Sequence, residues 1–106
     1  MLPSEYLAQG WCQHALQNDQ GEYCLLGAAK QWGGSFTKEY SQFTLGIYNQ
    51  LRAIGAIDEI TGWNNAPERT QAEVVALARL VEIKLGLRPR ETEAQHGIET
   101  LEGITA

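Results

Sequence analysis

Apolar residues recur every three or four positions along much of the chain, which is the spacing that places them on one side of an α-helix. A first helix is expected from about Pro3 to Leu16, because proline suits a first helical turn. Its apolar side is formed by Leu7, Trp11 and Ala15. Polar turn-forming residues follow at 18–21 and predict an antiparallel second helix over 22–32, which the paired glycines at 33–34 would end.

The most regular apolar pattern lies in the next segment, and its members are Phe36, Tyr40, Phe43, Ile47, Leu51 and Ile54. This spacing predicts a third helix that begins near Ser35 or Thr37, ends at Gly55 and buries the whole apolar face. Gly46 inside it is less favourable than alanine by about 1 kcal/mol, which indicates close contact with a neighbouring helix.

A loop and a fourth helix are expected after Gly55. Residues 56–69 are too rich in glycine, asparagine and proline to continue a helix, so they predict an ordered loop. Thr70 and Glu73 have the spacing of a capping box, which predicts that a helix begins at Thr70. The residues expected to face inward are Val74, Leu77, Val81 and Leu85.

Beyond Gly86 the apolar pattern weakens, although Ile98, Leu101 and Ile104 recur every three residues. A helical domain over 1–88 and a flexible or loosely docked C-terminal tail over 89–106 fit this change. Strand-like alternation does not persist anywhere long enough to build a sheet. The sequence therefore predicts an all-α fold, a compact bundle of about four helices.

Composition and charge narrow the function classes. The chain has 106 residues, 43% of them hydrophobic, which is enough for one globular domain. Thirteen acidic residues against eight basic ones give a net charge of −5, which argues against nucleic-acid binding. No apolar stretch approaches the roughly 20 residues that cross a bilayer, and no leader pattern opens the chain. We therefore expect a cytoplasmic protein without membrane contact.

The two cysteines are candidates for chemistry. In a helical hairpin Cys12 and Cys24 would be offset by roughly 7 Å along the helices, so free thiols are expected. Cys24 lies near a helix start, where the dipole favours a thiolate, and His14 or His96 could act as its base. The alternative, favoured by small and apolar neighbours, is a buried structural thiol. Because Cys12 and His14 point in different directions on a helix, no metal or cofactor is expected.

The segment 63–70 holds more hydrogen-bonding capacity than a simple connection needs. In a functional interpretation its side chains surround a polar ligand or partner, and the residues concerned are Trp63, Asn64, Asn65, Arg69 and Thr70. In a structural interpretation Trp63 closes the core, an asparagine forms an Asx turn and Arg69 pairs with a carboxylate. Turn and cap chemistry accounts for every one of these side chains, which favours the structural interpretation.

Three separated motifs resemble a family of small actinobacterial and phage proteins that is classed only as a domain of unknown function. They are an early tryptophan with a small residue after it, a C-L-x-G-A segment and a W-N-D-x-P-x-R-T segment. The matching residues are Trp11, Ala15, Cys24, Leu25, Gly27, Ala28, Trp63, Asn64, Pro67, Arg69, Thr70 and Val74. Asn65 stands where the family pattern has aspartate, which argues against a role that needs a carboxylate. The resemblance implies no activity.

These patterns favour a non-catalytic interaction or small-ligand-binding domain, such as a phage-borne or accessory factor acting on a host protein or a nucleotide signal. Its partner would be a protein or a small polar ligand, bound through the 63–70 segment. One alternative is a small enzyme that uses Cys24. Another is a homo-oligomeric structural protein that associates through the 36–54 face or the tail.

Overall fold

The computed structural model describes residues 1–56 and 59–89, and within these ranges the chain forms five helices. They are α1 (Pro3–Gln9), α2 (Leu25–Gly33), α3 (Lys38–Ala53), α4 (Ile60–Asn64) and α5 (Gln71–Lys84). Among the described residues, extended backbone pairing consists of two isolated β-bridges, which join Tyr23 to Trp11 and to Gln17. The all-α expectation is confirmed. The expected tail over 89–106 lies, apart from Pro89, outside the described residues.

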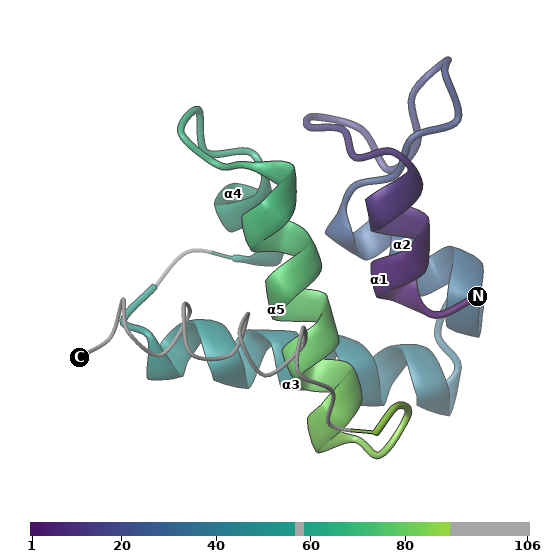
Figure 1. Cartoon of the computed structure of the whole chain (residues 1–106), viewed down its shortest axis with the longest axis vertical. Coiled ribbons are helices and arrows are strands. Elements are labelled where there is room, and N and C mark those ends of the chain that lie inside the picture. Colours follow the sequence, from purple (N-terminus) through teal and green to yellow (C-terminus); the bar gives the residue numbers. More distant parts are fainter. Residues whose placement is uncertain (57–58, 90–106) are drawn as a thin grey trace.

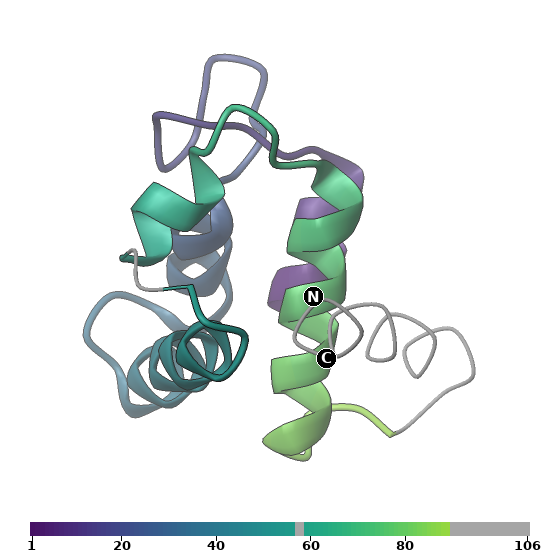
Figure 2. The ribbon, with the colours of Figure 1, turned by 90° about the vertical axis from the view of Figure 1, so that its left-hand side faces the viewer.

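The helices form two layers (Figure 2), with α1 beside α5 in one and α2, α3 and α4 in the other. Seen face on (Figure 1), α3 runs across α5 at a steep angle. The hydrophobic core lies between the layers and receives side chains from all five helices. Its largest fully buried apolar members are Phe43, Leu7, Leu25, Ile47, Leu51, Leu77, Leu80, Val74 and Val81.

The predicted third helix is confirmed as α3, but its apolar face is not buried throughout, because Tyr40 and Ile54 are half-buried and Phe36 is exposed. Phe43, Ile47 and Leu51 are completely buried. Phe36 is 91% exposed, because it precedes the N-cap Thr37 and has a left-handed backbone with φ of 63°. The contact predicted at Gly46 is also confirmed, since a Cβ there would lie 2.6 Å from Val81 Cγ1.

The predicted helix over 3–16 is wrong beyond Gln9, and residues 10–24 form an ordered loop instead of a helical hairpin. The two sides of this loop bond to each other. The Tyr23 N–H donates to the Gly10 carbonyl (3.1 Å), and the Cys24 N–H donates to the Leu16 carbonyl (3.2 Å). These long-range bonds satisfy backbone groups that a helix would pair locally, so the apolar spacing of the segment was misleading.

The prediction for residues 56–69 is wrong in part, whereas the predicted start of the following helix is confirmed. The loop interpretation is wrong over α4, a short helix that carries Trp63 and Asn64 into the interior. The capping box at the start of α5 is confirmed, with the Glu73 N–H donating to Thr70 Oγ1 and the Thr70 N–H donating to Glu73 Oε1. Leu85 is 38% exposed rather than buried, because α5 ends one residue before it.

A buried carboxylate joins the end of α5 to the start of α1. Glu82 is fully buried and accepts hydrogen bonds from the Ser4 N–H (2.8 Å) and hydroxyl (2.6 Å). Arg88 lies 3.4 Å from the same carboxylate. Burial raises the pKa of Glu82, and the Ser4 hydrogen bonds and the Arg88 charge oppose that rise. The contact fixes α1 against α5 near both ends of the described chain.

Candidate functional site

Trp63 and Arg69 form a structural unit at the junction of α4 and α5. Trp63 is 3% exposed and belongs to the core. The Arg69 guanidinium stacks over its ring at 3.9 Å and donates through Nε to the Trp63 carbonyl (2.9 Å). The same guanidinium pairs with the Glu73 carboxylate at 3.0 Å. Two guanidinium nitrogens of Arg69 are therefore engaged within the fold, and the pairing with Glu73 is the carboxylate contact of the structural interpretation.

Asn64 is buried and connects α4 with the 10–24 loop and with α2. Its Oδ1 accepts from the Trp11 indole N–H (2.8 Å) and from the Leu25 backbone N–H (3.1 Å). Its Nδ2 donates to the Cys12 carbonyl (3.2 Å) and to Asn65 Oδ1 (3.0 Å). All four bonds of this amide are internal, so Asn64 positions other residues and has no hydrogen-bonding capacity left for a ligand.

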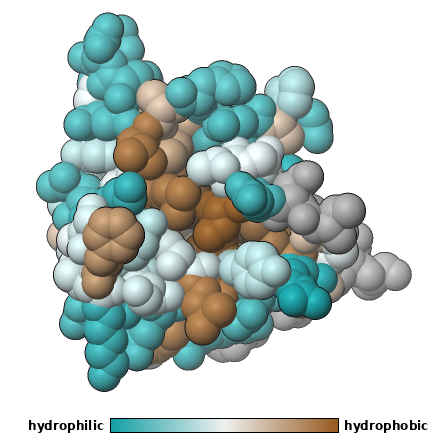
Figure 3. All heavy atoms as spheres, turned by 180° about the vertical axis from the view of Figure 1, so that it is seen from behind, coloured by the Kyte–Doolittle hydropathy of each residue, from teal (hydrophilic) through white to brown (hydrophobic). Residues whose placement is uncertain are grey.

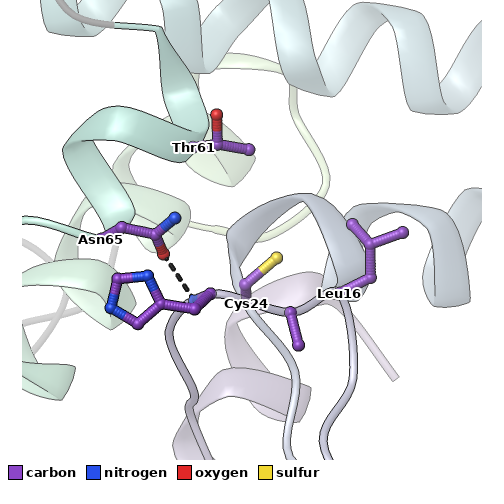
Figure 4. Close-up of a pocket in the computed structure, with 6 residues that line it drawn as sticks. Leu16, Cys24, Thr61 and Asn65 are labelled. Atoms are coloured by element: carbon purple, nitrogen blue, oxygen red, sulfur yellow. Dashed lines mark hydrogen bonds between the residues drawn. The ribbon is translucent and has the colours of Figure 1, made fainter.

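Asn65 extends this network to His14. Its Oδ1 accepts the His14 backbone N–H at 2.8 Å, drawn as the dashed line in Figure 4. His14 has a left-handed backbone with φ of 68°, a conformation that costs a residue with a Cβ about 1 to 2 kcal/mol. The asparagine pair therefore holds His14 in a strained but fixed conformation beside α4.

A pocket opens where the 10–24 loop, the start of α2 and α4 meet (Figure 4). Its volume is about 330 Å³. The lining combines polar and apolar side chains and consists of His14, Ala15, Leu16, Cys24, Thr61 and Asn65. Of the five residues that the sequence singled out for binding, Asn65 is the one that lines this pocket; Thr70 lies elsewhere as the exposed N-cap of α5.

Cys24 reaches the pocket but is 4% exposed and acts as the N-cap of α2. Its sulfur accepts a hydrogen bond from the Gly27 N–H at 3.3 Å. The Cys12 thiol donates to the Glu22 carbonyl at 3.3 Å, and burial raises its pKa. Both cysteines are free, as expected. The argument for free thiols from an offset between two paired helices does not apply, because residues 10–24 are not helical.

The sequence did not identify Leu16 or Thr61 as site residues, and it considered His14 only as a base or a metal ligand. Thr61 is an exposed residue of α4, a helix that was itself missed, and Leu16 was placed at the end of the predicted first helix. Their place at one pocket depends on the loop closing against α4, which local patterns do not encode. Across the two described ranges, no three histidine, cysteine or acidic side chains converge as metal ligands. In the same ranges, no helix has the length and apolarity to cross a membrane.

Comparison with known proteins gives a family but no activity. No curated protein and no solved structure matches the chain. A family model described as a family of unknown function (DUF6197) matches residues 4–82. Ser4 and Glu82, at the two ends of the matched range, are hydrogen-bonded to each other, so the range coincides with a closed structural unit. The chain therefore belongs to this family of unknown function, DUF6197.

Proposed function

We propose that this protein is a non-catalytic binding domain whose ligand site is the pocket between the 10–24 loop, α2 and α4. The observation that carries the proposal is the pocket itself, in which polar side chains surround a space of about 330 Å³. Small-molecule sites typically span about 300 to 1,000 Å³. The pocket therefore fits a small polar molecule or a single side chain of a partner protein.

The chemistry of the lining supports recognition of a molecule with both polar and apolar parts. The His14 imidazole, the Thr61 hydroxyl and the Asn65 carboxamide offer hydrogen bonds, whereas Ala15 and Leu16 offer apolar contact. Polar groups placed beside apolar ones are typical of sites that orient a ligand. We therefore place the ligand site at the 10–24 loop, and we assign to the 63–70 segment the role of holding that loop in place.

The backbone of His14 gives a second reason to place recognition here. Left-handed residues with a Cβ persist only where the surrounding structure enforces them, and they concentrate at functional sites. At His14 the enforcing contact is the hydrogen bond to Asn65 Oδ1. The fold thereby keeps the imidazole at the pocket at some cost in stability.

A cytoplasmic location fits the same proposal. Cys12 and Cys24 are both free, and free thiols are usual in a reducing compartment. The compartment also suits the expected ligand classes, a nucleotide signal or a host protein.

The test is a titration of the isotope-labelled protein followed by amide NMR. The probes are nucleoside monophosphates and free amino acids at millimolar concentrations. The proposal expects one probe class to shift the resonances of His14, Thr61 and Asn65. Ala15→Phe, which fills the pocket, should abolish these shifts. The matched control Ala72→Phe, at an exposed position of α5, should preserve them. Shifts that survive in Ala15→Phe would contradict the proposed site.

His14→Gly separates recognition from folding. Glycine adopts the left-handed backbone at no steric cost, so this variant should unfold at the same or a higher denaturant concentration than the wild type. It lacks the imidazole and should lose probe binding. A variant that loses stability instead would show that the His14 side chain serves the fold.

A small enzyme using Cys24 is the second candidate, because Cys24 and His14 line the same pocket. A reactive thiolate needs a partly exposed sulfur, and Cys24 is 4% exposed. Alkylation by iodoacetamide near neutral pH, followed by mass spectrometry of the Cys24 peptide, distinguishes the two candidates. The binding proposal expects much slower alkylation than that of a free thiol. Alkylation at or above the free-thiol rate would favour the enzyme.

A further inference from the structure

Helix α5 carries apolar side chains on all of its sides. Val74, Leu77 and Val81 are buried in the core. The opposite side of the helix consists of Ala72, Val75, Ala76, Arg79 and Ile83, which we call the α5 outer face. Ala72 is exposed and the other four side chains are half-buried. A helix that is apolar all round is normally covered on every side, so this face calls for an occupant.

The contacts of α5 show which of its sides the neighbouring helices use. Gln71 Nε2 donates to the Leu7 carbonyl of α1 at 2.8 Å. Lys84 Nζ donates to Gln50 Oε1 of α3 at 3.0 Å. With about 3.6 residues per turn, the α5 outer face lies on the third side of the helix, which points away from both α1 and α3.

The layer on the other side of the molecule has a mixed surface. Figure 3 shows this layer from outside, and apolar side chains reach the surface between pale and hydrophilic ones. On α3 the exposed Leu45 and Tyr48 share the outward side with the exposed Ser41, Gln42 and Asn49. Single apolar side chains among polar ones are ordinary protein surface. The α5 outer face differs because Arg79 is its single polar member.

We propose that the C-terminal segment 90–106 of the same chain packs on the α5 outer face as an antiparallel helix. These residues lie outside the described part of the chain. Ile98, Leu101 and Ile104 recur every three residues, which places them on one side of a helix. A helix over 90–106 is about 25 Å long, and α5, with 14 residues, is about 21 Å long. The segment is therefore long enough to cover the whole face.

The end of α5 directs the following chain towards this face. Gly86 has a left-handed backbone with φ of 75°, and the Leu87 N–H donates to the Glu82 carbonyl at 2.8 Å, so the helix ends in a tight turn. In Figure 2 the described chain after α5 leads away from the layer of α2, α3 and α4. Residues 85–89 form the connection, and connections of about two to eight residues are usual between antiparallel helices.

Charge and side-chain size favour the same pairing. Residues 90–106 are acidic, with glutamates at positions 91, 93, 99 and 102, whereas the charged residue of the α5 outer face is the cation Arg79. A return that turns at position 87 places Arg79 opposite position 95, between Glu91 and Glu99. It also places the large Ile98 side chain opposite the small Ala76.

The covalent connection favours this occupant over a separate molecule. A segment joined through a short connection has an effective concentration of about millimolar at its own helix. A second copy or another acidic protein has to compete from free solution at a lower concentration. Two copies can also exchange identical segments, and the experiment below distinguishes that arrangement.

The experiment places a nitroxide spin label on the segment and records amide NMR spectra of the full isotope-labelled chain. The label is attached to Thr105→Cys, and mass spectrometry checks that Cys12 and Cys24, which are 7% and 4% exposed, stay unlabelled. In the proposed register position 105 lies beside the start of α5. We therefore expect loss of the Ala72 amide signal and retention of the Leu45 signal on α3.

A second label position tests the direction of the segment. A label on Glu91→Cys should instead remove the amide signal of Ile83 near the end of α5 and retain that of Ala72. A parallel or irregular arrangement would not exchange the two effects in this way.

Substitutions in the segment test the apolar contact without altering the described core. In the chain labelled at position 105, Ile98→Asp with Leu101→Asp should restore the Ala72 signal. The matched control, Thr92→Asp with Gln95→Asp, adds the same charge away from the apolar side of the segment and should keep the signal loss. Unchanged amide positions in α3 show that each variant remains folded.

Four outcomes would overturn the proposal. They are a label effect spread evenly over the surface, an effect centred on α3 or on the pocket, equal effects in the Ile98→Asp, Leu101→Asp variant and its control, and signal loss in an isotope-labelled copy without a spin label when a spin-labelled copy is added. The last outcome would assign the segment on α5 to a second copy. The pocket plays no part in the expected result, which is therefore independent of the proposed ligand site.

Discussion

Replacing Asn64 is the sharpest test of how this fold is held together. Its amide joins α4 to the 10–24 loop and to the first turn of α2 through bonds to Trp11, Leu25 and Cys12. Asn64→Ala would leave the Leu25 N–H and the Cys12 carbonyl without their side-chain partner inside the protein. The Trp11 indole N–H is partly buried and can regain water.

The expected loss follows from these contacts. A buried polar group that loses its partner costs about 1 to 3 kcal/mol. Two such groups, with the more accessible indole, give a decrease of about 3 kcal/mol in the free energy of unfolding. Small domains have total stabilities of about 5 to 15 kcal/mol, so this is a large fraction. The melting temperature should fall by about 12 to 24 °C.

Asn64→Asp adds a pH dependence with a defined sign. Its second carboxylate oxygen would face the Cys12 carbonyl and Asn65 Oδ1, where the amide now donates. Burial and these oxygens should raise the folded-state pKa of the aspartate above its unfolded value of about 3.9. Protonation restores a donor, so the loss of stability relative to wild type should shrink as the pH falls from neutral towards about 4.

Urea unfolding followed by tryptophan fluorescence at several pH values measures both effects. Asn65→Ala is the matched control, because Asn65 is less buried, accepts two hydrogen bonds and should cost about 1 kcal/mol or less. Equal losses in Asn64→Ala and Asn65→Ala would refute the reasoning. So would a deficit of Asn64→Asp that grows as the pH falls.

Three further substitutions test other contacts. Gly27→Ala should cost more than about 2 kcal/mol in urea unfolding, because the new Cβ would lie 1.9 Å from the Leu16 carbonyl oxygen; an unchanged midpoint would show that the loop yields easily. Glu82→Gln isolates the raised pKa of that carboxyl. The advantage of wild type over this variant should shrink as the pH rises from about 4 to 7, because the buried carboxylate becomes charged; an advantage that grows would mean that the Ser4 and Arg88 contacts lower the pKa. Phe36→Gly should leave the melting temperature unchanged or higher, since glycine relieves the left-handed strain and the lost side chain is 91% exposed; a clear decrease in calorimetry would show that Phe36 supports the turn.

Several of the predictions that depended on local chemistry were accurate. The apolar spacing of Phe43, Ile47 and Leu51 marked the buried side of α3, and Thr70 with Glu73 marked the start of α5. Gly46 was correctly interpreted as a close contact between helices. Each of these features follows from residues within a few positions of one another or from the steric size of one residue.

The predictions that failed concern the 10–24 loop and α4. Both segments are stabilised by partners far away in the sequence, such as the bond between Trp11 and Asn64. The helical spacing of Leu7, Trp11 and Ala15 is a local feature, so it cannot show that long-range hydrogen bonds outweigh helix formation there. The sequence therefore placed the candidate site at 63–70, largely on side chains that the fold uses for internal contacts.

What the sequence by itself determined is the all-α class and the position of the longest helices. Helix periodicity and capping are local, so they can be deduced from neighbouring residues. Only the tertiary structure decided that Asn64 is an internal connector and that His14, Thr61 and Asn65 share a pocket. These facts depend on loop closure between residues some 50 positions apart, where long-range hydrogen bonds outweigh local helical preference.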